Sequence, residues 1–491
     1  MKKLKDFQFG YADAEKEFTR IPEIFDESFY DYRQIAQKLI EKDSFLLVGR
    51  KGVGKSAVNA RIRYLSTTKN NLNAFPLQLN DFEYTTFGKT SVDRNVIGTQ
   101  KYKDSWDFFM LVTIIKFLYN NVKITESVEL NKIIEVLEQL GFKIKNNLKY
   151  KQTVTRLSKI KVGAASAAIE LAFENLKTEK PDTFQEIMSL LNEEMYDAIE
   201  TTYTPTKEII IMIDGVDDIL RLRKNQLDIL SSLIRSVDYL NDKFFKDGIK
   251  IKITVCIRED ILIKITDPDL NKIKRDGSLT IDWSQDTDGL KKVVALRFKF
   301  SGINSEDSES YWYEIFPKEM QNKDSWEHVL EYTLYKPRDV LQFLKSCQEL
   351  YPENAKLSFK QVSDALKAYS KDYFIEEMKN EVTGFVSEQL IILLPVIFQR
   401  LGSNQFSYSE FRRNFDEQST TKIKNSEEVK LLLALLFESG YVGQLIKNKS
   451  KYGRETTSVI FKYRNPGSQV DFNQTFIIHK GIQKGLGIKL N

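Results

Sequence analysis

Short hydrophobic runs, each bounded by glycine or charged residues, recur along the first 300 residues. Because they are too short for buried helices, they are typical of strands buried on both faces of a parallel sheet. Pro76 predicts an edge position or a strand start for the second run. Longer helical patterns, over 105–119 and 225–240, separate the runs, and this alternation predicts a doubly wound α/β domain. The runs are 45–48, 74–79, 209–213 and 249–257.

The C-terminal residues, 385–491, carry a different pattern. A helix, a short strand, two helices and two strands follow one another, which resembles a winged helix. The predicted elements are helix 386–401, strand 406–408, helices 409–415 and 426–438, and strands 441–446 and 457–463. Residues 122–204 show helical patterns without strands, and we interpret them as a mostly helical insertion in the α/β domain.

The glycine-rich segment that follows the first run fits the P-loop pattern G-x-x-x-x-G-K-[ST] at every fixed position. Strand, loop and helix follow in the required order, so backbone N–H groups at the helix start would face nucleotide phosphates. Lys55 is expected to reach the β- and γ-phosphates, and Ser56 to ligate Mg²⁺. The predicted nucleotide-binding residues are Gly49, Arg50, Lys51, Gly52, Val53, Gly54, Lys55, Ser56 and Ala57.

An acidic cluster, Asp214-Gly215-Val216-Asp217-Asp218, ends the run 209–213. A carboxylate at the end of a buried strand is the Walker B arrangement, in which Asp214 would help to hold the Mg²⁺. Asp217 or Asp218 would then orient or deprotonate the attacking water. The alternative for that pair is an acidic loop or a helix cap.

Arg258 follows the run 249–257 directly. Ligands of parallel sheets bind beyond the carboxyl ends of the strands, so Arg258 is placed to sense a γ-phosphate or to reach across an interface. A local salt bridge with Glu259 or Asp260 is the alternative.

The order of P-loop, hydrophobic-D-G-x-D-D and hydrophobic-R-E-D resembles AAA+-related signal-transduction ATPases of the STAND kind and their defence-associated bacterial relatives. The resemblance implies ATP and Mg²⁺ as ligands, and a helical lid in which Arg338 of Tyr335-Lys336-Pro337-Arg338 contacts the nucleotide. The alternative is that Pro337 begins a helix whose Arg338 is solvated. Asp217 and Asp218 stand where many relatives carry glutamate, which implies slow hydrolysis.

These observations predict an α/β protein with a doubly wound P-loop NTPase core, a helical lid and a C-terminal winged-helix domain. The predicted limits are an N-terminal arm at 1–24, the core at 25–300, the lid at 301–384 and the winged helix at 385–491. The arm is expected either to pack on the nucleotide domain or to be a tail. The resemblance implies an ATP-driven switch in anti-phage defence that couples nucleotide state to a partner or effector encoded nearby.

Three other functions stay open. One is a DNA-binding ATPase similar to origin-recognition or loader proteins, and another is a scaffold that holds nucleotide without hydrolysing it. The third is a phosphotransferase, for which the sequence shows no acceptor site. Four cations of the predicted wing favour DNA, whereas leucines and glutamates over 426–438 favour a protein contact, because base edges are read by Arg, Asn or Gln. A solvated hairpin tip is a third interpretation of the wing. The wing cations are Lys447, Lys449, Lys451 and Arg454.

Composition narrows the picture in only a few respects. With 42% hydrophobic and 29% charged residues and a net charge of +4, the 491-residue chain is typical of a globular protein. The two cysteines, Cys256 and Cys347, and the two histidines, His328 and His479, are isolated, which argues against a disulfide framework, a zinc site or a Ser-His-Asp triad. We expect a cytoplasmic protein without membrane contact, and a homo-oligomer that depends on nucleotide.

Overall fold

The computed structural model describes residues 2–80, 82–90, 102–124, 126–145, 150–172, 183–203, 207–216, 224–265, 267–268, 270–303, 310–418, 426–449 and 455–488. They form two compact units, which we call the sheet unit and the helical unit. The sheet unit comprises Arg33–Arg50 and Val58–Thr280, and the helical unit comprises Met1–Tyr32, Lys51–Ala57 and Ile281–Asn491. The division passes through the P-loop, whose residues Lys51–Ala57 group with the helical unit.

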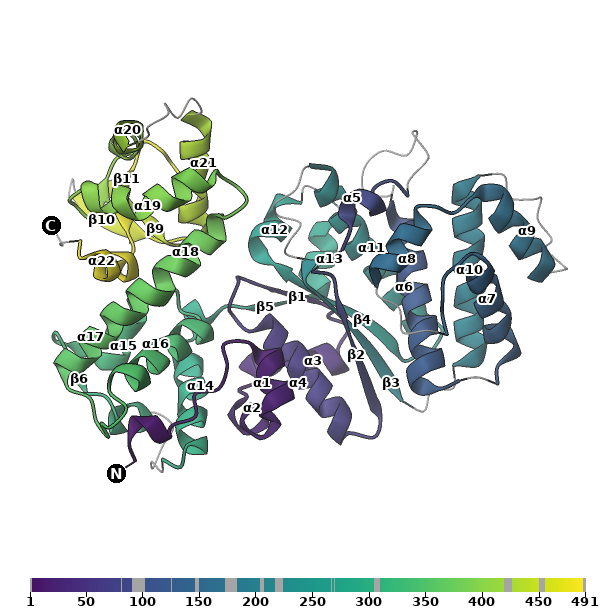
Figure 1. The fold of residues 1–491 in the computed structure, drawn as a ribbon, viewed down its shortest axis with the longest axis horizontal. Coiled ribbons are helices and arrows are strands. Elements are labelled where there is room, and N and C mark those ends of the chain that lie inside the picture. Colours follow the sequence, from purple (N-terminus) through teal and green to yellow (C-terminus); the bar gives the residue numbers. More distant parts are fainter. Residues whose placement is uncertain are drawn as a thin grey trace. The chain divides into compact units, whose positions relative to one another are not determined.

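A five-stranded sheet with the order β2-β3-β4-β1-β5 is the centre of the sheet unit (Figure 1). The pairs β2–β3, β3–β4 and β1–β4 are parallel, and β1, β3 and most of β4 are buried, as expected for continuous hydrophobic runs. Pro76 lies in β2 at an edge of the sheet, as predicted. The strands are β1 (Leu46–Gly49), β2 (Leu72–Gln78), β3 (Glu208–Asp214), β4 (Ile251–Arg258) and β5 (Ser278–Ile281).

Helices complete the sheet unit. The helix α6 is buried along nearly its whole length and packs against α10 and α11, where the Trp106 indole donates a 2.9 Å hydrogen bond to the Ile229 carbonyl. The helices are α3 (Ile35–Glu41), α4 (Lys55–Thr68), α5 (Tyr84–Phe87), α6 (Lys103–Phe117), η4 (Leu118–Val122), α7 (Val128–Gln139), α8 (Tyr150–Leu157), α9 (Val162–Ala172), α10 (Phe184–Thr202), α11 (Lys224–Lys246), α12 (Glu259–Lys264) and α13 (Leu270–Gly277). The α/β fold with a parallel central sheet is therefore confirmed.

The helical unit contains a C-terminal helical domain built around α16 and α17, which pack against each other. A π-helical turn, η8, joins α17 to α18 without a break. Its elements are η6 (Trp283–Gln285), α14 (Thr287–Phe300), η7 (Ser310–Glu314), β6 (Glu319–Met320), β7 (Lys323–Asp324), α15 (Ser325–Leu330), α16 (Pro337–Leu350), α17 (Phe359–Tyr369), η8 (Ser370–Phe374) and α18 (Ile375–Val382). The predicted limit between core and lid at residue 300 stays a prediction; α14 groups with the helical unit.

The last part of the helical unit has the helix and strand order of a winged helix, with one strand more than predicted. Its antiparallel sheet has the order β10-β9-β11-β8, so β11 separates the wing strands from β8. The prediction of a strand over 457–463 was wrong at its end, because the chain turns after Ile460 and the Asn465 N–H donates to the Phe461 carbonyl. The elements are α19 (Glu388–Arg400), β8 (Gln405–Phe406), α20 (Tyr408–Gln418), α21 (Ser426–Ser439), β9 (Val442–Lys449), β10 (Glu455–Ile460), β11 (Thr475–Ile478) and α22 (Lys480–Leu486).

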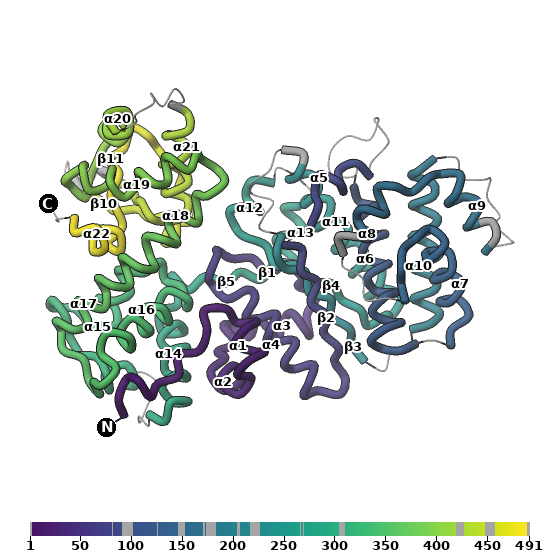
Figure 2. The backbone as a smooth tube through the Cα atoms, in the orientation of Figure 1, coloured from purple at the N-terminus to yellow at the C-terminus, as the bar shows by residue number. Residues whose placement is uncertain are grey.

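The N-terminal segment packs on the helical domain, so it is not a free tail (Figure 2). Phe7 and Phe9 contact the ring of Phe298 in α14, with centroids 5.4 and 6.1 Å away. Glu17 forms a buried ion pair of 2.7 Å with Arg297. The segment contains η1 (Leu4–Asp6), α1 (Ala14–Arg20), α2 (Pro22–Ser28) and the start of η2 (Tyr32–Gln34).

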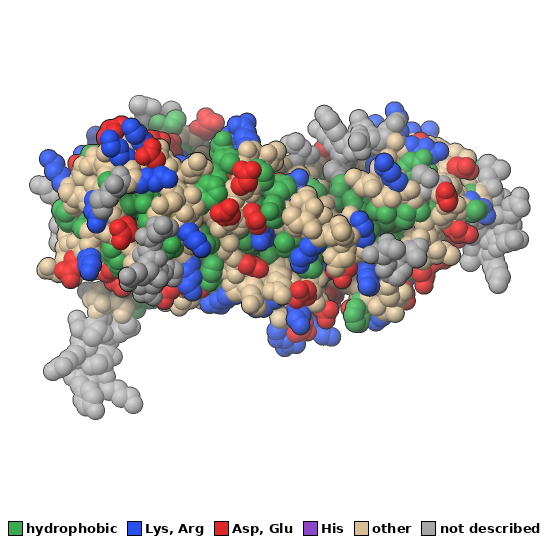
Figure 3. Space-filling view, turned by 90° about the horizontal axis from the view of Figure 1, so that it is seen from below, with side chains coloured by type: hydrophobic (Ala, Val, Ile, Leu, Met, Phe, Trp, Pro, Cys, Tyr) green, Lys and Arg blue, Asp and Glu red, His purple; other side chains and the backbone are tan. Residues whose placement is uncertain are grey.

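Charges of both signs are interspersed on the face drawn in Figure 3, in keeping with the small net charge. Within the described ranges, no helix is both long and apolar enough to cross a membrane.

Candidate nucleotide-binding site

The P-loop backbone has the conformation that its glycines allow. The strand β1 ends at Gly49 and α4 begins at Lys55, and between them Gly52 and Gly54 have φ values of +83° and +108°, which side-chain-bearing residues rarely adopt. Lys55 is buried at the first position of α4, whereas Ser56 is exposed. A helix start that follows such a loop presents backbone N–H groups to an anion, so this geometry fits a nucleotide phosphate.

Three predicted site residues lie at the carboxyl ends of parallel strands of the sheet. Gly49 ends β1, Asp214 ends β3 and Arg258 ends β4, and Gly49 is the register partner of Arg258. Asp214 is 9% exposed, and its Oδ1 accepts a 2.8 Å hydrogen bond from the Gly215 N–H. A largely buried carboxylate at this position suits the hard oxygen ligation that Mg²⁺ prefers.

Gly215 is required by both its conformation and its surroundings. Its φ is +79°, and a Cβ atom there would lie 1.9 Å from Asn80 Oδ1 and 2.8 Å from the Asn80 backbone nitrogen. The Asn80 side chain can rotate, but the backbone nitrogen has little room to move. The glycine therefore lets the chain turn directly after Asp214 and so sets where the carboxylate lies.

We predict that Gly215→Ala destabilises the protein by about 2 kcal/mol or more, from backbone strain and the clash with Asn80. The matched control is Gly163→Ala, because Gly163 lies in α9 without a positive φ, and a Cβ atom there would meet no atom of the described residues within 4 Å. Alanine there should be neutral or stabilising by about 0.5–1 kcal/mol. Urea unfolding measures both, and equal stabilities of the two variants would contradict the requirement.

Arg258 forms the local salt bridge that the sequence left open. Its Nε and Nη2 donate 2.9 Å hydrogen bonds to the two carboxylate oxygens of Asp260, and the Arg258 side chain is 14% exposed. This bidentate pairing holds the Arg258 guanidinium against Asp260, which lies two residues later in the chain. A role of Arg258 at the γ-phosphate stays a prediction; the pair with Asp260 uses two of the five guanidinium N–H donors.

Within the helical unit, four side chains lie beside P-loop residues 51–53. Trp283 Nε1 donates a 2.9 Å hydrogen bond to the Val53 carbonyl, and Glu377 in α18 lies 3.4 Å from Lys51 Nζ. A Cβ atom on Gly52 would lie 3.4 Å from Cδ of Lys336 and 3.7 Å from Cβ and Cδ of Arg338. The helical domain therefore contacts the loop that would bind phosphate, and the half-buried Arg338 has its aliphatic stem beside the loop, while its contact with nucleotide stays a prediction.

Some predicted residues lie outside the described ranges. These are Asp217 and Asp218, and the wing cations Lys451 and Arg454. Lys447 and Lys449 lie in β9, which pairs with β10. The structure describes their backbone but not their side chains. The buried face of α21 includes Leu432, Leu433 and Leu436, while its first turn carries Glu427 and Glu428, so its leucines are largely core.

Three residues at the P-loop were not predicted from the sequence as site residues: Trp283, Lys336 and Glu377. The first belongs to the segment Ile281-Asp282-Trp283, and the second precedes Arg338, but neither carried a signal of contact with the loop. Glu377 has an ordinary position in an amphipathic helix, and only the fold brings it to Lys51.

Comparisons with known proteins agree with part of this organisation. Residues 288–376 match the model of the FunZ-associated C-terminal helical domain, a range that extends from α14 through η8 into α18. The chain is 20% identical, over 511 aligned residues, to the "Putative transposon gamma-delta 80.3 kDa protein" of Escherichia coli (strain K12), covering 99% of this chain and 68% of that protein.

The crystal structure of Cdc6p from Pyrobaculum aerophilum aligns with 98% of each chain at 11% identity, with a TM-score of 0.30. This overlap is too weak to define a shared arrangement. The α/β core is established by the strand order and parallel pairing instead, and the chain is similar to these proteins without being assigned to their families.

Proposed function

We propose that the protein binds ATP with Mg²⁺, hydrolyses it slowly and acts as a molecular switch. The observation that carries this proposal is the enclosure of P-loop residues 51–53 by Trp283, Lys336, Arg338 and Glu377 of the helical unit. A ligand that enters the P-loop must compete with, or add to, these contacts. The helical domain would therefore respond directly to the occupant of the loop.

The chain's own residues supply defined parts of the binding step. Backbone N–H groups from Gly49 to Ala57 would bind the phosphates, and Lys55 would neutralise the β- and γ-phosphoryl oxygens. Ser56 and Asp214 would hold the Mg²⁺, which on binding would neutralise charge that develops on the transferred phosphoryl group. Arg338, beside Gly52, would contact the terminal phosphate through two parallel hydrogen bonds.

Hydrolysis requires a group that orients or activates the attacking water. Asp217 and Asp218 are proposed to orient the attacking water, and an aspartate is shorter than the glutamate of many relatives. Turnover is therefore expected to be slow, which suits a switch better than a motor.

The biological setting is proposed from the resemblance alone: anti-phage defence in bacteria, with a protein partner or effector contacted by the winged-helix part. The name of the Escherichia coli relative connects that protein to a transposon, so a mobile genetic element is another setting in which related chains occur. A protein partner is favoured over DNA because the first turn of α21 carries Glu427 and Glu428, which would repel phosphate.

The test is limited proteolysis of the protein with Mg²⁺ and ATP, ADP or no nucleotide. We expect ATP to change the cleavage rate within residues 331–385 several-fold relative to ADP, because only ATP offers a γ-phosphate to Arg338. In Arg338→Met the ATP and ADP patterns should coincide while ADP binding persists. Identical patterns with both nucleotides in the wild type would defeat the switch.

A further inference from the structure

A chain of side-chain contacts begins and ends at the P-loop. Glu377 lies 3.4 Å from Lys51 Nζ in the loop. One helical turn earlier, the Tyr373 hydroxyl donates a 3.2 Å hydrogen bond to Oδ1 of Asp339. Asp339 directly follows Arg338, whose side chain lies against the loop glycine. The first turn of α16 and the helix η8–α18 therefore both contact the loop, and they are linked to each other.

Asp339 is the residue that joins the two sides. It is 4% exposed, and besides Tyr373 it binds the backbone N–H of Leu334, whose nitrogen lies 2.8 Å from its Oδ2. Its position in the first turn of α16 lets the carboxylate interact favourably with the helix dipole. Lys336, the residue before this helix, provides no side-chain cap, so Asp339 and its two donors fix how α16 begins.

The π-helical turn η8 places Tyr373 in this arrangement. It lies within one continuous helical stretch, and π-turns in such stretches are frequent at functional sites. The side-chain oxygens of Tyr369 and Ser370, at its start, are buried without a hydrogen-bond partner among the described residues. Buried polar groups without a hydrogen-bond partner usually destabilise a fold. A turn that leaves them unsatisfied while aiming Tyr373 at Asp339 is better explained by the placement of Tyr373 than by stability.

We propose that Tyr373 and Asp339 are positioning residues, which hold Arg338 against the P-loop in the direction that recognises the terminal phosphate of ATP. The inference rests on the proposed function and adds to it the residues that make the site distinguish ATP from ADP. A guanidinium binds a phosphate well only when its planar fork is aligned. Fixing the first turn of α16 in advance removes part of the ordering that binding would otherwise require.

The state of Tyr373 is suited to this role. Burial, followed by the nearby carboxylates of Asp339 and Glu377, raises the pKa of Tyr373 well above its ordinary value, while Arg338 acts in the opposite direction. The phenol therefore stays protonated and remains a hydrogen-bond donor to Asp339 across the neutral range. The expected discrimination should not change between about pH 6 and pH 9 through titration of this group.

The test compares ATP and ADP affinities, with Mg²⁺, of Tyr373→Phe by calorimetry. We expect ATP affinity to fall about tenfold, the size of one lost hydrogen bond to a charged group, with ADP affinity nearly unchanged. The matched control is Tyr351→Phe, which removes an exposed phenol that donates a 3.1 Å hydrogen bond to Asp364 in the same domain. It should leave both affinities as in the wild type.

Asp339→Asn should act in the same direction as Tyr373→Phe, and it keeps the inference testable if the phenylalanine variant does not fold. A positioning role also predicts that Tyr373→Phe has no further effect once Arg338 is replaced by methionine. A merely structural role would lower both affinities, or would add to the effect of Arg338→Met, and either result would overturn the inference. If the wild type binds both nucleotides and Tyr373→Phe has the same ratio of ATP to ADP affinity as the wild type, only this inference fails. If the wild type binds neither nucleotide, the proposed function fails as well.

Discussion

Replacing Lys55 by alanine is expected to weaken ATP binding by about a hundredfold or more while the protein stays folded. Lys55 is the first residue of α4 and is only 8% exposed. Charge-assisted hydrogen bonds to phosphate contribute roughly 1.5–3 kcal/mol each, so losing two of them accounts for this factor. Because ATP at a concentration c stabilises the folded state by RT ln(1 + c/Kd), the ATP-induced rise in Tm should largely disappear when c is about ten times the wild-type Kd.

Stability without nucleotide should change little in Lys55→Ala, or should even rise. A cation at a helix N-terminus opposes the helix dipole, and alanine removes that repulsion. The matched control is Lys69→Ala, just beyond the other end of α4, where the side chain is exposed. It should keep ATP affinity within about twofold, because surface substitutions seldom exceed about 0.5 kcal/mol. Equal ATP affinities of the two folded variants by calorimetry would remove Lys55 from the site.

Local patterns predicted the fold where local residues determine it. The central strands β3 and β4 are hydrophobic along most of their length because both faces of the sheet are covered, so their runs were recognisable. The glycines of the P-loop were recognisable for a similar reason, since the loop needs the positive φ values of Gly52 and Gly54. The short strand β11 was missed because four residues offer too little alternation to separate a strand from a loop.

The contacts of the helical unit with the P-loop could not be predicted from the sequence, because they join residues that are far apart in the chain. Trp283 and Val53 are 230 positions apart, and nothing near either residue indicates the hydrogen bond between them. For Arg258 the sequence left open a salt bridge with Glu259 or Asp260 and a contact with a γ-phosphate, and the structure pairs its guanidinium with Asp260. Pairing of this kind depends on side-chain directions, which motif spacing does not determine.

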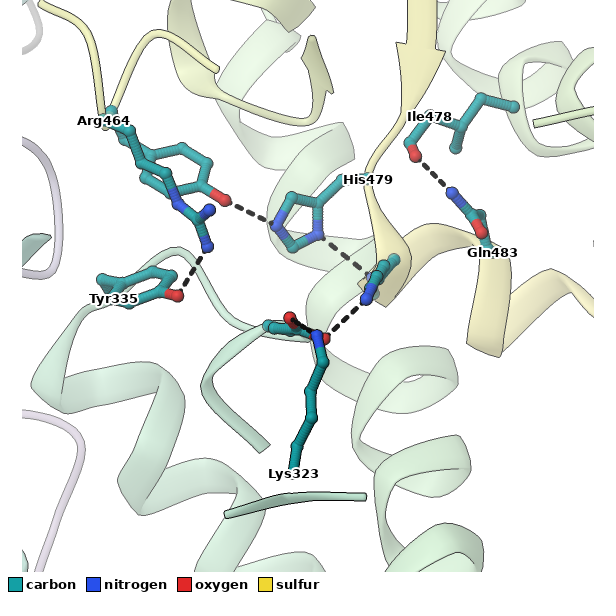
Figure 4. A network of polar contacts seen from close by, with 10 residues as sticks. Lys323, Tyr335, Arg464, Ile478, His479 and Gln483 are labelled. Atoms are coloured by element: carbon teal, nitrogen blue, oxygen red, sulfur yellow. Dashed lines mark hydrogen bonds and ion pairs between the residues drawn. The ribbon is translucent and has the colours of Figure 1, made fainter. Parts of the chain in front are cut away.

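The last large effect concerns His479, which lies at the start of α22 next to the winged-helix strand β11. Its side chain is 1% exposed, and its Nδ1 accepts a 3.1 Å hydrogen bond from the Gly481 N–H. Its Nε2 lies 3.2 Å from the Tyr463 hydroxyl, and dashed lines in Figure 4 mark the contacts of both ring nitrogens of His479. In the same figure Arg464 donates a hydrogen bond to Tyr335, directly before Lys336, so the network reaches the segment that contacts the P-loop.

Protonation of His479 is strongly disfavoured in this position. Burial is the main cause, and with the nearby charges of Arg464 and Lys480 it lowers the pKa of His479 to about 3. The Thr333 backbone and Glu331 act in the opposite direction. A proton on Nδ1 would also face the Gly481 N–H and break the helix cap. The unfolded chain takes up this proton near about pH 6.5, so the folded state is fully favoured above that pH and loses stability as the pH falls from about 6.5 towards 3.

We therefore expect β11 and α22 to lose about 2 kcal/mol of stability against opening between about pH 7.5 and pH 5. Hydrogen exchange of amides 476–486 measures it, and comparison with His479→Asn at each pH cancels the intrinsic exchange rate. Asparagine keeps a cap acceptor but does not titrate. The free energy of opening of the wild type, relative to that of His479→Asn, should therefore fall by about 2 kcal/mol as the pH falls. His328→Asn replaces the other histidine of the chain, whose pKa burial also lowers, and it measures what that group contributes to the pH dependence of these amides. If the difference in opening free energy between the wild type and His479→Asn is constant over this pH range, His479 is not the group whose protonation opens β11 and α22.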